Sequence, residues 1–245
     1  MSHFRAAVIQ TGTEAGGAAA HDAWGWDDGI YELIATYDEN LEVEPRVDET
    51  RDEALAHVRE RIGQLRQKEA DGESLTDSER EYLAHADDDD DDELLDWYAQ
   101  WWEADRDEEG NFLTTYNPKS KYDYYSKIMT LTLDEWVAEG RELSEEKLRA
   151  EWREFSAKGD GFYNKRYYLD RYEDEDTYVK VARLPNTWAV VTPDGEWHEP
   201  GKVGWWGMDS STAESLREWA DKFHERFVEP YDPETTTVAI LDCHI

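Results

Sequence analysis

The last third of the chain decides the fold: GFYNKRYYLDRY (161–172), WAVVTPDGEWHEPGKVGWWGMDSS (188–211) and TVAILDCHI (237–245). The first segment is rich in aromatic residues. The second reads as a hairpin, because Pro193-Asp194-Gly195 is a turn sequence that follows an apolar run. The third is an apolar strand, and because no polar tail follows it we expect it to be tied into the structure.

A second buried strand is predicted at the start of the chain, where FRAAVIQ (4–10) is followed by Thr-Gly. If the first and last strands pair antiparallel, the start of one lies beside the end of the other. This pairing would bring His3 close to Asp242 and His244. Two imidazoles and a carboxylate suit a divalent metal or acid/base catalysis. The alternative is that both histidines are structural residues at strand ends, and no HExxH, CxxC, P-loop or GxSxG pattern accompanies them.

Further candidate site residues lie in aromatic segments. We predict an aromatic strand over Lys121–Tyr125, with Lys121 and Asp123 embedded in it. A structural cluster is the simplest interpretation. Alternatively, Lys121 and Asp123 join His3, Asp242 and His244 as catalytic residues in a polar pocket walled by Tyr and Trp. The candidate binding residues are Tyr125, Trp197, His198, Trp205 and Trp206.

The sequence predicts an α+β fold, with a mixed or antiparallel sheet of about five or six strands and helices packed on it. Capping boxes at Thr50 and Thr76 each begin a helix with apolar residues at helical spacing, and a third box is expected at Ser211–Glu214. The run Asp87–Asp92 suits the start of a helix. It could also bind a cation such as Ca²⁺, although it lacks the glycine and the alternating ligands of a Ca²⁺ loop.

One domain is expected over residues 1–245, with a helical segment at about 50–106 and a loop insertion at about 11–30. The single Cys243 excludes an internal disulfide. It lies in an apolar run and is therefore predicted to be a buried, inert thiol; a reactive nucleophile is the alternative.

Charge limits the function classes. Sixty acidic residues against 26 basic ones give a net charge of −34. Such a surface suits a saline cytosol, where salt screens repulsion, or an acidic mimic of DNA. We favour salt adaptation because the acidic residues occur in every segment. Without a basic patch, direct nucleic-acid binding is not expected.

Composition also bears on localisation. The 12 Trp, 14 Tyr and 6 Phe exclude a disordered chain. No run approaches the roughly 18 apolar residues of a membrane span, and the start lacks a charged segment followed by an apolar one. These patterns predict a soluble, cytoplasmic protein without a membrane partner.

Several segments together resemble a family of uncharacterised proteins carried by tailed phages and related mobile elements. Members of that family open with MSHF, carry an NPxSKWDWY-type segment and end in DCHI. In those relatives the KWDWY segment runs into Gly-Gly-Arg-Trp, whereas Ser126-Lys127-Ile128-Met129 follows Tyr125 here. If that arginine holds a ligand in the relatives, the role is lost or relocated in this chain. The matching segments are MSHF (1–4), YDENLEVEP (37–45), TYNPKSKYDYY (115–125), FYNKRYYLDRY (162–172), WAVVTPDGEWHEPGKVGWWGM (188–208) and DCHI (242–245).

Three functional hypotheses follow, and we favour the first because the sequence contains no recognised catalytic spacing. The first is a non-catalytic viral accessory protein of a halophilic host that binds a host or virion protein through aromatic patches such as GWWG. Such a protein would act in the host cytoplasm or in the virion. The second is a small metal-dependent hydrolase or nucleotide-handling enzyme that uses the terminal histidines, with a divalent metal as its cofactor. The third is a DNA mimic. The first predicts no convergent polar cleft, whereas the second requires His3, Asp242 and His244 to meet at a pocket.

Overall fold

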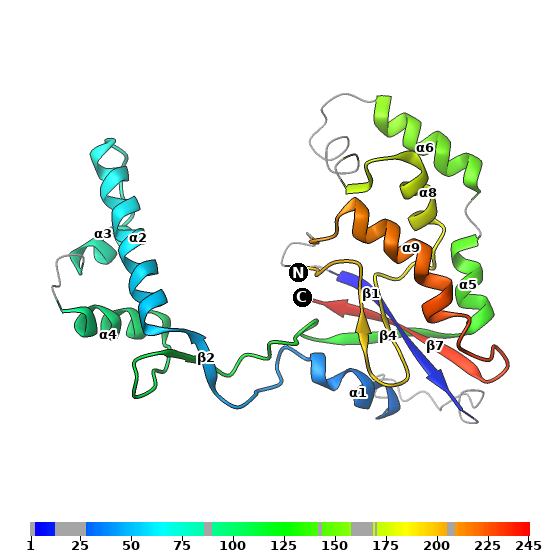
Figure 1. Cartoon of the computed structure of the whole chain (residues 1–245), viewed down its shortest axis with the longest axis horizontal. Helices are drawn as coiled ribbons and strands as arrows, with labels where there is room; N and C mark the ends of the chain where they lie inside the picture. Colours follow the sequence, from blue (N-terminus) through cyan, green and yellow to red (C-terminus); the bar gives the residue numbers. More distant parts are fainter. Residues whose placement is uncertain are drawn as a thin grey trace. The chain divides into compact units, whose positions relative to one another are not determined.

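The computed structural model describes residues 3–12, 28–85, 90–141, 144–157, 169, 171–204 and 209–245. The chain divides into two compact units. The larger comprises Met1–Leu41 and Pro118–Ile245, and the smaller comprises Glu42–Asn117. The elements are labelled in Figure 1.

The larger unit is built on a five-stranded mixed sheet with the order β4-β7-β1-β5-β6. β1 and β5 are parallel, and the other neighbours are antiparallel. With eight α-helices in the described part of the chain, this sheet confirms the predicted α+β class. The strands are β1 (His3–Thr11), β4 (Tyr125–Thr132), β5 (Ala189–Val191), β6 (Trp197–His198) and β7 (Thr236–His244).

The first and last strands form the centre of this sheet. β1 and β7 pair antiparallel along their whole length, from His3 opposite His244 to Thr11 opposite Thr236. The antiparallel pairing that was assumed for the sequence argument is therefore present. Both strands are buried in their middle, which is why they read as continuous apolar runs in the sequence. Cys243 is fully buried in β7, and burial raises the pKa of its thiol, as expected for an inert cysteine.

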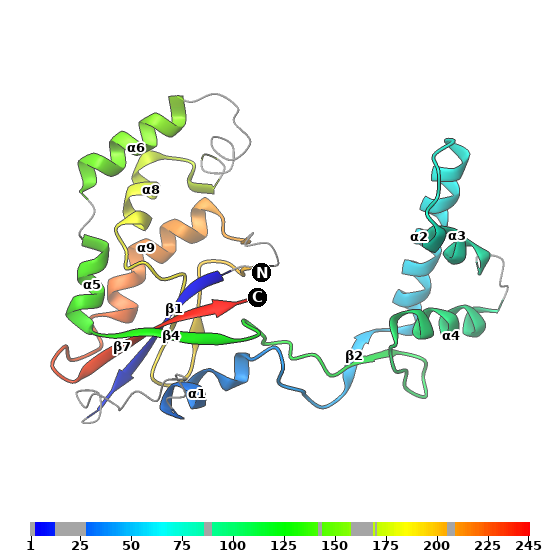
Figure 2. The same ribbon diagram turned by 180° about the vertical axis from the view of Figure 1, so that it is seen from behind.

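Helices cover one face of the sheet. Ala7 and Ile9 of β1, with Val238 and Ile240 of β7, pack against α5 (Leu133–Arg141) and α9 (Ala213–Phe227). Figures 1 and 2 show these two helices on the same side of the sheet. The buried helix residues are Leu133, Trp136, Val137, Trp219, Phe223 and Phe227.

The opposite face carries Phe4, Ala6 and Val8 of β1, because successive strand residues point to opposite faces. Ile30 and Ile34 of α1 (Asp28–Ile34) complete the core there. A 3₁₀ turn at Ala35–Tyr37 follows α1.

Local signals explain where helices begin. Thr212 caps α9, and its hydroxyl accepts a hydrogen bond from the Ser215 amide at 3.1 Å. The expected box at Ser211–Glu214 is therefore wrong by one residue.

The expected aromatic strand at Lys121–Tyr125 is also wrong, because β4 begins only at Tyr125. Tyr122 is instead buried next to α1, where its hydroxyl donates a hydrogen bond to the Ile34 carbonyl at 3.1 Å.

Gly140 in α5 supports a close approach of two backbone segments. A Cβ at this position would lie 2.3 Å from the Arg183 carbonyl oxygen and 2.4 Å from the Leu184 carbonyl carbon. Gly140→Ala is therefore expected to destabilise the protein by about 1–3 kcal/mol, because the overlap exceeds the gain in helix propensity. Chemical denaturation measures the change.

Gly63 supplies the matched control for that variant, since it is also helical and a Cβ there would meet nothing within 4 Å. Gly63→Ala is expected to be neutral or stabilising by about 0.5–1 kcal/mol. A Gly140→Ala protein as stable as the wild type would contradict the packing described here.

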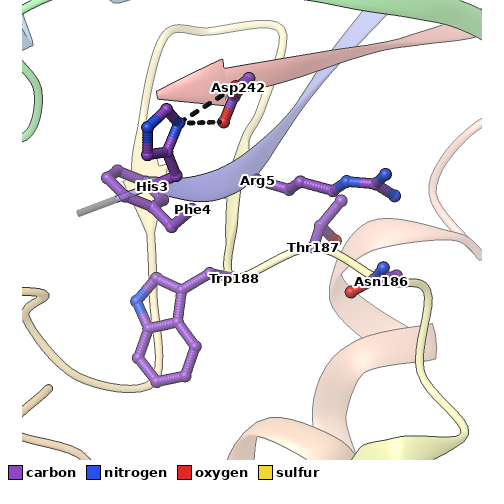
Figure 3. Close-up of a pocket in the computed structure, with 7 residues that line it drawn as sticks. All are labelled: His3, Phe4, Arg5, Asn186, Thr187, Trp188 and Asp242. Atoms are coloured by element: carbon purple, nitrogen blue, oxygen red, sulfur yellow. Dashed lines mark hydrogen bonds and ion pairs between the residues drawn. The ribbon is translucent and has the colours of Figure 1, made fainter. Parts of the chain in front are cut away.

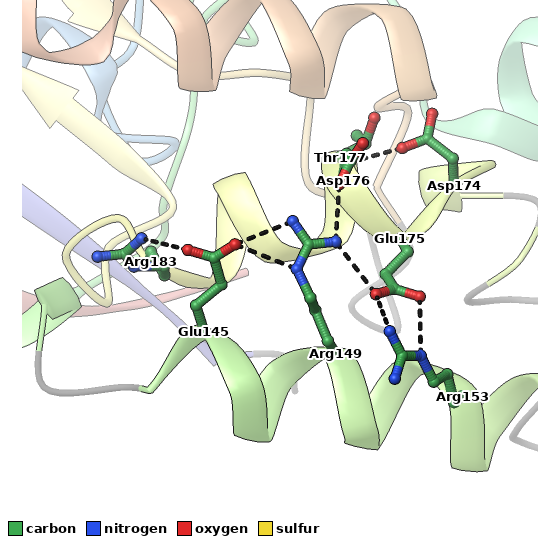
Figure 4. A network of polar contacts seen from close by, with 8 residues as sticks. All are labelled: Glu145, Arg149, Arg153, Asp174, Glu175, Asp176, Thr177 and Arg183. Carbon is green, nitrogen blue, oxygen red and sulfur yellow. Dashed lines mark hydrogen bonds and ion pairs between the residues drawn. The ribbon is translucent and has the colours of Figure 1, made fainter.

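An ion-pair network joins α6 (Glu145–Ala157) to α8 (Glu175–Ala182), as Figure 4 shows. Arg149 lies 2.9 Å from Glu145, 3.1 Å from Glu175 and 2.8 Å from Asp176. Hydrogen bonds to these carboxylates, to Asp176 first, raise the pKa of Arg149. The planar guanidinium can serve several carboxylates at once, which a lysine cannot do as well.

The smaller unit has its own hydrophobic core. The predicted capping boxes at Thr50 and Thr76 are confirmed, and Asp90 caps the next helix. Of the acidic run, residues 86–89 lie outside the described residues. The elements of this unit are β2 (Arg46–Glu49), α2 (Arg51–Ala70), α3 (Asp77–Ala84), α4 (Asp91–Trp102) and β3 (Phe112–Thr114).

This core explains why the expected single domain differs from the observed division. Leu55, Val58 and Ile62 of α2 pack on Leu95 of α4 and on Phe112, so the apolar residues of the segment are satisfied within it. Of the loop insertion expected at about 11–30, residues 13–27 lie outside the described residues. No helix in the described ranges is both long enough and apolar enough to cross a membrane.

Candidate metal centre

The candidate site lies at the ends of β1 and β7. His3 is directly opposite His244, and Arg5 is directly opposite Asp242. Residues paired in this way share one face of an antiparallel sheet. These four side chains therefore continue the face that carries Ala7 and Ile240, at the end where apolar residues give way to polar ones.

Three ligand-type groups converge there. His3 Nδ1 lies 3.3 Å from both carboxylate oxygens of Asp242, and His244 Nε2 lies 3.9 Å from Asp242 Oδ2. One ligand atom from each residue lies within 4.8 Å of the others. Tetrahedral ligands about 2.1 Å from a zinc ion are roughly 3.4 Å apart, and the separation of 3.3 Å between His3 Nδ1 and the Asp242 carboxylate is close to that spacing.

His244 is held more firmly than His3. Its ring stacks on Tyr124 at 3.7 Å between centroids, and the His3 ring meets it edge-on, also at 3.7 Å. Burial lowers the pKa of His244, and the neighbouring His3 acts in the same direction. Both effects favour the neutral imidazole, which is the form that binds metals. Its Nδ1 is buried and has no hydrogen-bond partner among the described residues.

Asp123 is connected to the site by a backbone hydrogen bond to His244. Its amide donates to the His244 carbonyl oxygen at 2.9 Å, and its carboxylate accepts from the Tyr124 amide at 2.5 Å. The carboxylate also opposes the lowering of the His244 pKa as a minor contribution. Asp123 thus positions the strand end that carries His244.

An open hollow of about 460 Å³ is lined by two of the three groups, His3 and Asp242. The side chains of His3 and Asp242 are 52% and 33% exposed, so two of the three groups face open space. Catalytic zinc sites have three protein ligands and one position open to water or substrate. The hollow, drawn in Figure 3, is lined by His3, Phe4, Arg5, Asn186, Thr187, Trp188 and Asp242.

Lys121 is not part of this hollow, which corrects the expected single pocket. Its ammonium lies 2.6 Å from Glu199, whose other oxygen accepts from Trp197 Nε1 at 3.0 Å. Lys121 and Glu199 line a second, smaller hollow of about 80 Å³. The ion pair with Glu199 holds Lys121 there.

The three predicted binding residues that the structure describes, Tyr125, Trp197 and His198, do not form one surface. Trp197 packs among Phe4, Tyr37 and Tyr122 in the core, and Tyr125 meets Tyr122 edge-on at 5.6 Å.

His198 faces the other side of the sheet and contacts Phe227 at 5.3 Å between ring centroids. Burial lowers its pKa. Adjacent strand residues point to opposite faces, so Trp197 and His198 cannot line one pocket. Trp205 and Trp206 lie outside the described residues.

Sequence reasoning missed Arg5, Asn186 and Thr187 in the hollow. Arg5 had a signal, because it is two residues from His3 in a strand and must share its face. Asn186 and Thr187 had none, since they reach the hollow through the parallel pairing of β5 with β1.

Comparisons with family models, with curated proteins and with solved structures find no match to this chain.

Proposed function

We propose that this protein is a small metal-dependent hydrolase in which His3, Asp242 and His244 hold a divalent transition metal. The observation that carries the proposal is the convergence of these three groups within 4.8 Å, with His3 and Asp242 lining a hollow. His3 and Asp242 are 239 positions apart in the chain. Two imidazoles and one carboxylate suit Zn²⁺, and the same set suits Fe²⁺.

The proposed reaction is the hydrolysis of an ester by water that a bound metal activates. A divalent metal held by His3, Asp242 and His244 would supply the chemistry that activates water for attack on an ester at neutral pH. The hollow beside His3 and Asp242 offers the space for the ester.

The interaction hypothesis has less support. It predicts an exposed aromatic patch and no convergent polar cleft. The exposed aromatic residues of the described chain are divided between the two units, with Tyr31 and Tyr124 in the larger and Trp102 and Tyr116 in the smaller. A viral origin in a halophilic host remains a proposal that rests on composition and resemblance, and it is compatible with a hydrolase.

An activity assay tests the proposal. Protein purified in molar salt is stripped with EDTA and assayed on phosphate monoesters, phosphodiesters and carboxylic esters, with Zn²⁺, Mn²⁺ or Fe²⁺ added singly. We expect one metal to restore hydrolysis and Asp242→Asn to abolish it. His57→Gln is the control, because His57 is an exposed histidine 3.5 Å from Glu49 in the smaller unit. Metal binding without hydrolysis of any ester would contradict the enzymatic part of the proposal.

A further inference from the structure

Arg5 is an unusual arginine in this chain. With 60 acidic residues for 26 basic ones, carboxylates are abundant, and Arg149, Arg171 and Arg217 are each held by at least one. Arg5 is half-buried in the wall of the hollow, yet it forms no hydrogen bond or ion pair through its side chain with any described residue. A partly buried guanidinium without a protein partner is costly unless water or a ligand satisfies its donors.

The register explains why Arg5 stays unpaired. Its direct cross-strand neighbour is Asp242, and opposite charges in such positions ordinarily attract. The Asp242 carboxylate instead faces His3 at 3.3 Å. Figure 3 shows the guanidinium extending away from His3, toward the side of the hollow where Thr187 and Asn186 lie.

Thr187 supplies a second unsatisfied group. Its hydroxyl oxygen is buried and has no hydrogen-bond partner among the described residues. It belongs to the segment before β5, whose Trp188 amide donates to the Arg5 carbonyl at 2.7 Å. That backbone bond fixes Thr187 beside the strand that carries Arg5. A hydroxyl and a guanidinium together suit an oxyanion.

We infer that Arg5, with Thr187 and Asn186, binds the phosphoryl group of the substrate. The inference rests on the proposed function and gives it a substrate class, a phosphate ester whose phosphoryl group binds in the hollow that His3 and Asp242 also line. Arginine recognises tetrahedral phosphate through paired N–H donors. At low ionic strength a chain of net charge −34 repels anions at long range, so an anionic substrate gains from such a local positive contact.

Binding of inorganic phosphate tests the inference by calorimetry in molar KCl, with EDTA-stripped and with Zn²⁺-loaded protein. We expect Arg5→Gln to weaken phosphate binding about tenfold or more, because the variant loses a charged hydrogen bond. Arg5→Lys is expected to weaken binding less, because it keeps the positive charge and loses only the paired N–H donors of the guanidinium. Arg226→Gln is the matched control. Arg226 is exposed on α9 and the variant has the same charge change.

The outcomes separate the two proposals. Phosphate binding that depends on Arg5 in stripped protein supports the inference, even if Zn²⁺ does not bind and the metal proposal fails. Equal phosphate affinity in wild type and Arg5→Gln overturns the inference, even if Zn²⁺ binds. Absence of phosphate binding to the wild type also overturns it. An acetate arm distinguishes the ligand class, since acetate binding tighter than phosphate would contradict a phosphoryl subsite.

Discussion

Asp242→Asn is expected to lower the affinity for Zn²⁺ by at least about 100-fold, because it replaces the only anionic group of the proposed ligand set with a neutral amide of the same shape. Loss of an outer-sphere partner alone typically costs 10–100-fold, so loss of a direct ligand should cost no less. His3→Ala is expected to behave similarly. Its side chain is 52% exposed, so the substitution leaves no cavity in the core. Calorimetric titration of Zn²⁺ into stripped protein measures both effects.

The choice of variants follows from burial. His244 is only 6% exposed and its ring is held between Tyr124 and His3, so His244→Ala would mix lost ligation with lost packing. His57→Gln controls for unspecific loss of a surface histidine and should bind Zn²⁺ as the wild type does. Unchanged Zn²⁺ affinity in Asp242→Asn would remove Asp242 from the ligand set.

A rise in KCl from 0.1 M to 2 M is expected to increase the melting temperature by on the order of 10 °C. The Debye length falls from about 10 Å at 0.1 M to about 3 Å at 1 M, so salt removes most long-range repulsion. Salt also weakens ion pairs such as Arg149–Asp176, but 60 acidic residues have only 26 cations to pair with, so repulsion dominates. At about 2–4 °C per kcal/mol, the rise corresponds to roughly 3–5 kcal/mol.

Differential scanning fluorimetry across the salt series measures this shift. Sucrose at matched osmolality is the control, because it strengthens burial without screening charge. A melting temperature that stays constant or falls with KCl would contradict salt adaptation and would weaken the argument for a halophilic source.

The sequence was informative where a local pattern of apolar residues, a turn or a helix cap determines the structure. The apolar runs near the two ends of the sequence predicted two buried strands, and an assumed antiparallel pairing of these strands then brought His3, Asp242 and His244 together. The turn at Pro193-Asp194-Gly195 and the boxes at Thr50 and Thr76 were likewise local signals.

Other features depend on contacts between distant segments. The parallel pairing of β5 with β1 brings Asn186 and Thr187 to the hollow, and no local pattern encodes it. Lys121 was expected near the histidines, but a glutamate 78 positions later holds it elsewhere. The separation of Glu42–Asn117 as its own unit results from the internal core of that segment, which helical periodicity alone cannot distinguish from a face packed on the main sheet.

Anomalous diffraction at the zinc edge, from crystals grown with Zn²⁺, shows whether β1 and β7 build a metal site. One anomalous peak is expected at about 2.0–2.2 Å from a nitrogen of His3, an oxygen of Asp242 and a nitrogen of His244. A crystal with zinc bound elsewhere on the acidic surface and no peak between these three residues would contradict this expectation.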